Sequence, residues 1–295
     1  MGKGFLKSKL VYDFLHDPPA VVGSIIVTLF IILALLAPWI APQNPYDLEK
    51  VMLSDFLRPP IWMEGGQAPF LLGTDDQGRG VLSTILYGSR TSLTVAFGVV
   101  LLAGGFGVTM GMLAGYYGRI LDTLLMRLAD ILFSFSTALI AFLLLGLFKQ
   151  RGVLTVILAI CVADWVRYAR TMRGSVLEVK EQAYITAAKA TGASDLRILM
   201  KHLLPNALPP IFVVVAVDFA VVIMFESTLS FLGVGVPLTE PSLGMMIAIG
   251  KDYIYAGMWW LVIFPGGALV LLVVGINIFA DWLREKLNPK IERTR

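Results

Sequence analysis

The sequence has few of the residues on which most enzyme active sites depend. Its 295 residues include one cysteine, Cys161, and two histidines, His16 and His202. A single cysteine excludes a disulfide within the chain. The sequence contains no H-E-x-x-H zinc motif and no Walker A phosphate loop. Both histidines lie outside the apolar segments, so an intramembrane serine–histidine protease is excluded as well. These absences predict a protein that is not an enzyme, with no catalytic residues, metal site or cofactor of its own.

Charge is also scarce. Asp, Glu, Lys and Arg make up 15% of the chain, whereas soluble domains have about 25%. Hydrophobic residues make up 57%, and the mean hydropathy is +0.78. This composition predicts an integral membrane protein surrounded by lipid. The net charge of +3 is too small to indicate a nucleic-acid partner.

Six apolar segments are predicted to cross the membrane, because about 20 apolar residues span its hydrocarbon core. They cover residues 21–40, 92–118, 131–148, 152–163 (continuing into Asp164 and Arg167), 211–234 and 253–280. A cleaved signal peptide is the competing interpretation of the first segment. Its apolar core would be about 7–15 residues long, so an uncleaved helix is favoured.

The segment 42–90 is polar and rich in proline and glycine. Its sequence GTDDQGRG superficially resembles a phosphate loop but lacks the Gly-Lys-Ser/Thr ending. We therefore expect an external structural loop with one short amphipathic helix at 81–87. The division of the chain is predicted as 1–91 (cytoplasmic tail, first span, external loop) and 92–295 (five-helix core). Within the second span, small residues at helical spacing predict close helix packing, at Gly104, Gly105, Gly107, Gly111 and Gly115.

The distribution of Lys and Arg predicts the orientation. With both termini in the cytoplasm, most of the 24 basic residues fall in cytoplasmic segments, as the positive-inside rule requires. These segments are the N-terminal tail with Lys3, Lys7 and Lys9, the region 119–127, the insert 165–210 and the C-terminal tail with Lys290, Arg293 and Arg295.

Four acidic residues lie within or beside the predicted spans, where ionisable groups usually face a partner or a cavity. Asp130 follows Arg127, and Asp164 precedes Arg167, at a spacing that favours ion pairs on a helix. Asp218 and Glu226 have no basic residue nearby in sequence. They could face a translocation pathway, contact another subunit or lie near the interface. They also leave open a proton-coupled secondary carrier.

Between the fourth and fifth spans lies a long basic, amphipathic insert, residues 165–210. Apolar residues recur at helical spacing on both sides of Gly192: Ile185, Ala188, Ala190, Leu196, Leu199 and Leu203. Gly192 fits a turn with positive φ. Ser194 then fits an N-cap with Asp195 in the first turn, and Pro205 is expected to end the second helix. The insert is predicted to be a helix–turn–helix docking surface.

The stretch TAAKATG (residues 186–192), nine further residues and then HLLP (202–205) resemble the EAA loop of bacterial ABC-importer permeases. The pattern of that loop is E-A-A-x-x-x-G, nine residues and I-x-L-P. Thr186 replaces its glutamate, Glu181 lies upstream of that position, and His202 replaces its isoleucine. Residues 17–23, 72–93, 126–136, 226–237 and 241–250 also resemble, in the right order, the dipeptide, oligopeptide and nickel permease family, with the N-terminal stretch typical of its second, C-type subunit.

The resemblance implies an all-α, six-span permease of the ABC type I importer fold in the bacterial inner membrane. It implies a related permease as heterodimer partner, two cytoplasmic ATPases that bind ATP and magnesium, and an external substrate-binding protein that delivers peptides. Nickel or another small solute is the alternative cargo. Residues 178–207 would form the ATPase-coupling loop, which we refer to as the coupling loop. Its candidate residues are Glu181, Thr186, Ala187, Ala188, Lys189, Gly192, Asp195, Arg197, His202, Leu204 and Pro205. The alternative is an interfacial helix pair lying on lipid headgroups.

Overall fold

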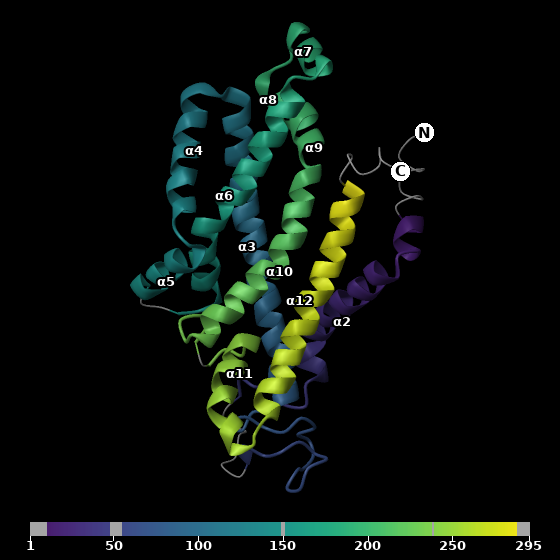
Figure 1. Cartoon of the computed structure of the whole chain (residues 1–295), viewed down its shortest axis with the longest axis vertical. Coiled ribbons are helices and arrows are strands. Elements are labelled where there is room, and N and C mark those ends of the chain that lie inside the picture. Colours follow the sequence, from purple (N-terminus) through teal and green to yellow (C-terminus); the bar gives the residue numbers. More distant parts are fainter. Residues whose placement is uncertain (1–10, 48–54, 149–150, 238, 288–295) are drawn as a thin grey trace. The chain divides into compact units, whose positions relative to one another are not determined.

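A computed structural model describes residues 11–47, 55–148, 151–237 and 239–287. Within these ranges the fold is helical, and the one β-type contact is an isolated bridge between Thr74 and Gly80. Figure 1 shows the helices in chain order: α2 (Pro18–Ile40), α3 (Val81–Tyr117), α4 (Arg119–Ser134), α5 (Thr137–Leu147), α6 (Val153–Lys180), α7 (Ala183–Ala190), α8 (Asp195–Arg197), α9 (Leu204–Ala207), α10 (Pro209–Phe231), α11 (Leu243–Gly250) and α12 (Trp260–Leu287).

The chain forms two compact units, each assembled from distant segments. Unit 1 contains residues 1–96, 144–157 and 220–279, and unit 2 contains residues 97–143, 158–219 and 280–295. This grouping does not test the predicted division at residue 91, which lies within α3. The terminal basic residues on which the predicted orientation partly rests, Lys3, Lys7, Lys9, Lys290, Arg293 and Arg295, lie outside the described residues.

Four described helices are long and apolar enough to cross a membrane: α2, α3, α10 and α12. The bent pair α4–α5 adds a fifth if it forms one span. The predicted fourth span coincides with the start of α6, but three charged residues, Asp164, Arg167 and Arg170, lie in the first 18 residues of that helix. Because of these three charged residues, α6 is not among the helices that are apolar enough to cross a membrane by composition. Length and composition therefore support up to five of the six predicted crossings.

The third predicted span is broken. Instead of a continuous helix over 131–148, α4 ends at Ser134 and α5 begins at Thr137, with an 88° bend. Phe135 is extended, and the Ser134 hydroxyl donates to the Asp130 and Ile131 carbonyl groups. Such local hydrogen bonds compete with the helical hydrogen bonds of the backbone and can bend a helix. Hydropathy measures only how apolar the residues are, so it did not show the break.

The short helix predicted at 81–87 and the second span are a single helix, α3, of 37 residues. In its polar start the hydroxyl groups of Thr84 and Thr91 donate to carbonyls four residues earlier, so these polar side chains have hydrogen-bond partners within the helix. The last span also differs from the prediction. Residues 251–256 form a 3₁₀ segment, and α12 starts only at Trp260.

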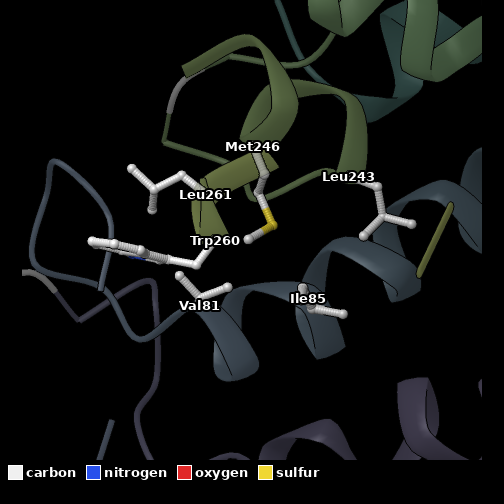
Figure 2. Packing of buried hydrophobic residues seen from close by; sticks show 6 residues of the cluster. All are labelled: Val81, Ile85, Leu243, Met246, Trp260 and Leu261. Carbon is white, nitrogen blue, oxygen red and sulfur yellow. The ribbon is translucent and has the colours of Figure 1, made fainter. Parts of the chain in front are cut away.

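The core of unit 1 joins the starts of α3, α11 and α12. Figure 2 shows the six buried side chains of this cluster, with Met246 directed toward α3: Val81, Ile85, Leu243, Met246, Trp260 and Leu261. Burying each such side chain contributes about 1.5–3 kcal/mol. This cluster fixes the beginning of the 37-residue helix.

The loop before α3 is held together by one acidic side chain, Asp75. Asp75 accepts hydrogen bonds from the backbone N–H groups of Gln77 and Arg79, and pairs with the buried Arg79 guanidinium at 2.8 Å. Burial raises the pKa of the neighbouring Asp76 carboxyl, and the Asp75 charge raises it further. The glycines and acids of GTDDQGRG therefore build a turn, in agreement with the rejection of a phosphate loop.

Candidate functional site

The coupling loop contains α7, a four-residue turn, α8, a π-helical segment (Ile198–Leu203) and α9. α7 and α8 lie beyond the C-terminal end of α6 in unit 2 (Figure 1). Most of the predicted residues lie on these elements: Thr186, Ala187, Ala188 and Lys189 on α7, Asp195 and Arg197 on α8, His202 on the π segment, and Leu204 and Pro205 on α9. Glu181 lies between α6 and α7, and Gly192 lies in the turn.

Gly192 makes the turn, as predicted. Its φ of +79° is in the left-handed region, where a residue with a Cβ is disfavoured by about 1–2 kcal/mol. The Gly192 N–H donates to Lys189 O at 3.0 Å and the Ala193 N–H donates to Ala188 O at 3.1 Å. These two bonds define a Schellman motif at the end of α7. A Cβ at Gly192 would have no neighbour within 4 Å, so the backbone conformation, and not lack of space, requires glycine.

Ser194 is at the N-cap position of α8, as predicted, but its hydroxyl makes no capping hydrogen bond. The Asp195 carboxylate lies in the first turn, where it suits the helix dipole. It accepts a hydrogen bond from the Tyr116 hydroxyl at 2.5 Å. Asp195 therefore ties the loop to another helix.

The expectation that Pro205 ends the second helix is wrong. The chain continues as π helix from Ile198 to Leu203 and as α9 from Leu204 to Ala207. The Leu204 N–H bonds to Leu199 O, five residues earlier, immediately before the proline. This wider turn relieves the clash between the Pro205 ring and the preceding turn, so the helix passes through.

One face of the loop is buried and the other is exposed. The buried side chains are apolar: Ile185, Ile198, Leu199, Leu203 and Ala207. The exposed surface, which we call the docking face, includes Ala187, Leu196, Arg197, Met200 and Lys201. Leu196 is 71% exposed and Met200 is 52% exposed. Helical spacing predicted Leu196 on the same face as Leu199 and Leu203. The π geometry that begins at Ile198 changes the rotation per residue, so Leu199 and Leu203 lie on a different face from Leu196.

Two residues that are not among the predicted site residues also hold the loop: Tyr116 of α3 and Lys180, the last residue of α6. Tyr116, near the end of α3, lies below the ammonium groups of Lys180 and Lys189, which are 5.6 and 5.3 Å from its ring centroid. The Lys180 Nζ also donates to Tyr116 O at 2.5 Å. The Tyr116–Asp195 contact joins residues 79 positions apart, so no sequence spacing could have indicated it.

Three arginines of α6 bind carboxylates of the neighbouring helices. Arg173 makes two bonds to Asp122 of α4, at 2.5 and 2.6 Å. Arg170 pairs with Asp130 at 2.7 Å, so the predicted partner Arg127 was wrong. A side chain on an adjacent helix reaches the carboxylate, which local spacing cannot show. These pairs fasten α4 to α6.

The third arginine, Arg167, pairs with Asp164 at 3.5 Å, as predicted. It also forms an ion pair with Asp218 of α10, and the Tyr168 hydroxyl donates to the same carboxylate at 2.7 Å. Asp218 thus has a basic partner through the tertiary structure, although none lies near it in sequence. This network joins α6 to α10 within unit 2.

Glu226 has a different environment. It is completely buried, and the hydroxyls of Ser92 and Ser230 donate to its two carboxyl oxygens at 2.7 and 2.8 Å. Ser227 and Ser242 are further hydroxyl neighbours. The group joins α10 to α3 within unit 1. Among the described residues, no three His, Cys, Asp or Glu side chains gather to hold a metal ion.

The apolar helices, the broken span and the charged loop define a multi-pass membrane permease. The chain belongs to the family of binding-protein-dependent transport system inner membrane components, which matches residues 107–293. Residues 9–60 match the N-terminal transmembrane domain of oligopeptide transport permease C. These matches confirm the family and the C-type assignment predicted from the motifs.

Relatives match over nearly the full length. The dipeptide transport system permease protein DppC of Haemophilus influenzae is 36% identical over 282 residues, covering 96% of this chain and 94% of that protein. The di/tripeptide permease DppC of Pseudomonas aeruginosa is 36% identical over 280 residues, covering 95% and 91% respectively.

The fold agrees with these relationships. An inward-facing structure of the MetNI methionine ABC transporter matches with a TM-score of 0.57 and 20% identity, covering 70% of this chain and 97% of that chain. The protein therefore has the ABC type I importer permease fold and is a multi-pass inner-membrane protein.

Proposed function

We propose that this permease carries di- or oligopeptides as one half of a heterodimeric pathway with a related permease. Two cytoplasmic ATPases bind ATP and magnesium and drive it, and an external binding protein delivers the substrate. The peptide cargo is supported by relatives named as dipeptide and di/tripeptide permeases. Lys180, Lys189, Arg197 and Lys201 favour a cytoplasmic position for the coupling loop, with both termini on the same side.

The observation that carries the proposal is the form of the coupling loop. A glycine turn closed by two backbone hydrogen bonds presents two exposed apolar side chains, Leu196 at 71% and Met200 at 52%, beside basic residues. An amphipathic helix of this kind suits a groove with an acidic rim on a partner protein. Because the buried face of the loop is packed within unit 2, a displacement of the docked ATPase would be passed to the helices as a rigid movement.

Reconstitution with the three classes of partner tests the proposal. In proteoliposomes containing both permeases and the ATPases, we expect uptake of a labelled dipeptide only with ATP and binding protein. Uptake by this chain alone, driven by a proton gradient, would show a secondary carrier instead. ATP-driven uptake of nickel but not of peptide would overturn the proposed cargo while leaving the mechanism intact.

A single substitution tests the docking face. Leu196→Asp places a charge where an apolar contact is proposed, and we expect it to abolish co-purification of the ATPases from detergent. Tyr255→Asp is the matched control, because Tyr255 is 99% exposed on the 3₁₀ segment of unit 1. Normal ATPase recovery with Leu196→Asp would contradict docking at this surface.

A further inference from the structure

Tyr116 lies where the ends of four helices meet. It is in the last turn of α3, and its partners are the last residue of α6, the last turn of α7 and the first turn of α8. The Tyr116 side chain is only 7% exposed. All of these residues belong to unit 2. Tyr116 therefore connects α3 to three separate elements at the coupling loop.

Each part of Tyr116 makes a different contact. Its hydroxyl donates to Asp195 Oδ1 at 2.5 Å, and its carbonyl accepts from Lys180 Nζ at 2.5 Å. Lys180 also reaches Gly115 O at 3.4 Å, so its charge satisfies the free carbonyls at the end of α3 and complements the helix dipole. The ring face is covered by the ammonium groups of Lys180 and Lys189, a favourable cation–π arrangement.

These contacts constrain both sides of the Gly192 turn. Lys189 precedes the turn and Asp195 follows it, and both reach the same tyrosine. The glycine sets the bend between the two arms, while Tyr116 sets the orientation of both arms relative to α3. The hydrogen bond from the hydroxyl is to a charged acceptor, the stronger kind.

We infer that Tyr116 is a positioning residue that transmits movement of the coupling loop to α3. The inference rests on the proposed function, because it assumes that an ATPase moves this loop. When the docked loop is displaced, the Tyr116 hydroxyl and the Lys180 ammonium carry the displacement to the end of α3, which runs as one helix to Val81. Without this link the ATPase would still bind, but its movement would reach α3 less completely.

A double-mutant cycle in the reconstituted transporter tests the link. Tyr116→Phe keeps the ring and both cation–π contacts but removes the hydroxyl. We expect the ATPases to co-purify normally, while peptide uptake per ATP hydrolysed falls about tenfold, the scale of one hydrogen bond to a charged group. Asp195→Ala should give a similar loss, and the double variant should be no worse than either single variant. Asp195→Asn, which keeps an acceptor oxygen, should restore most of the coupling.

Tyr117→Phe is the matched control, since it removes the same atom from the neighbouring, half-exposed ring. Normal uptake per ATP in Tyr116→Phe, or additive losses in the double variant, would overturn the inference. Leu196→Asp, tested alongside, separates the two proposals. If it prevents ATPase binding while Tyr116→Phe is fully active, only the role of Tyr116 is wrong. If Leu196→Asp has no effect, docking at this loop is wrong as well.

Discussion

Glu226 shows how a carboxyl group can be held inside a membrane helix when no basic side chain among the described residues pairs with it. Its two oxygens accept hydrogen bonds from Ser92 on α3 and Ser230 on α10. An unsatisfied buried polar group costs about 1–3 kcal/mol, so these hydroxyls are needed to keep the side chain buried. The arrangement favours a structural role, in which Glu226 joins α10 to α3, over the proton-coupling role that would suit a secondary carrier.

Two substitutions distinguish these roles. Glu226→Gln should leave assembly, melting temperature and uptake close to normal, because a serine hydroxyl can either donate to the new amide or accept from it. Glu226→Ala should lower the melting temperature by several degrees, since it leaves hydroxyls unpaired and a cavity behind. Heating followed by size-exclusion chromatography measures both effects. Asp252→Asn, an exposed acid in unit 1, is the control. A loss of uptake in Glu226→Gln with unchanged stability would instead indicate a proton-coupling group.

At the scale of elements, α6 is the helix to which unit 2 is fastened. Its arginines form ion pairs with carboxylates on α4 and α10. The α3 helix also packs closely against α6. Four of the five predicted glycines face α6: Gly104, Gly107, Gly111 and Gly115. At Gly105 an added Cβ would have no neighbour within 4 Å. Small residues allow backbones to approach closely where lipid supplies no hydrophobic driving force.

The glycines of α3 therefore differ in how a methyl group affects them. At Gly111 a Cβ would lie 2.2 Å from the Ala169 carbonyl oxygen. We expect Gly111→Ala to destabilise the protein by about 1–3 kcal/mol through overpacking. Gly105→Ala should be neutral or stabilising by up to about 1 kcal/mol, because alanine favours the helix. Thermal melting in detergent compares the two variants, and an equal effect would contradict the close packing of α3 on α6.

At the scale of the whole molecule, the proposed function requires the coupling loop to face the cytoplasm. The chain also has only one natural cysteine, Cys161, which is half-buried. Cys161→Ala therefore gives a background free of thiols in which single cysteines can be placed by design. The exposed positions Ser194, in the coupling loop, and Tyr255, after α10, are suited to this.

Labelling with a membrane-impermeant thiol reagent tests the orientation. We expect Tyr255→Cys to react in intact spheroplasts and Ser194→Cys to react only in inverted vesicles. The reverse pattern would invert the proposed topology. Reaction of both from the same side would contradict a membrane crossing by α10, the span that separates the two positions. Permeabilised membranes, in which both should react, control for accessibility.

The length and spacing of apolar residues were enough to predict a helical membrane protein. Four of its spans needed only their own composition, because the lipid core requires every backbone group to bond within its own helix. The Gly192 turn was also predictable from local sequence, because glycine has no Cβ and adopts a positive φ readily. The EAA-type pattern then indicated the family, although Thr186 and His202 depart from it.

The tertiary structure decided how the charged and polar groups are matched. Asp130 pairs with Arg170 of another helix and not with Arg127, and Asp218 pairs with Arg167. The hydroxyl groups around Glu226 likewise join separate helices. Tyr116 was missed for the same reason. Helical spacing reports neighbours along one helix, whereas partners on another helix depend on how the two pack. The sequence by itself determined four of the spans, the turn and the family. Only the folded chain decided which side chains connect the coupling loop to the helices, because those contacts form between residues far apart in sequence.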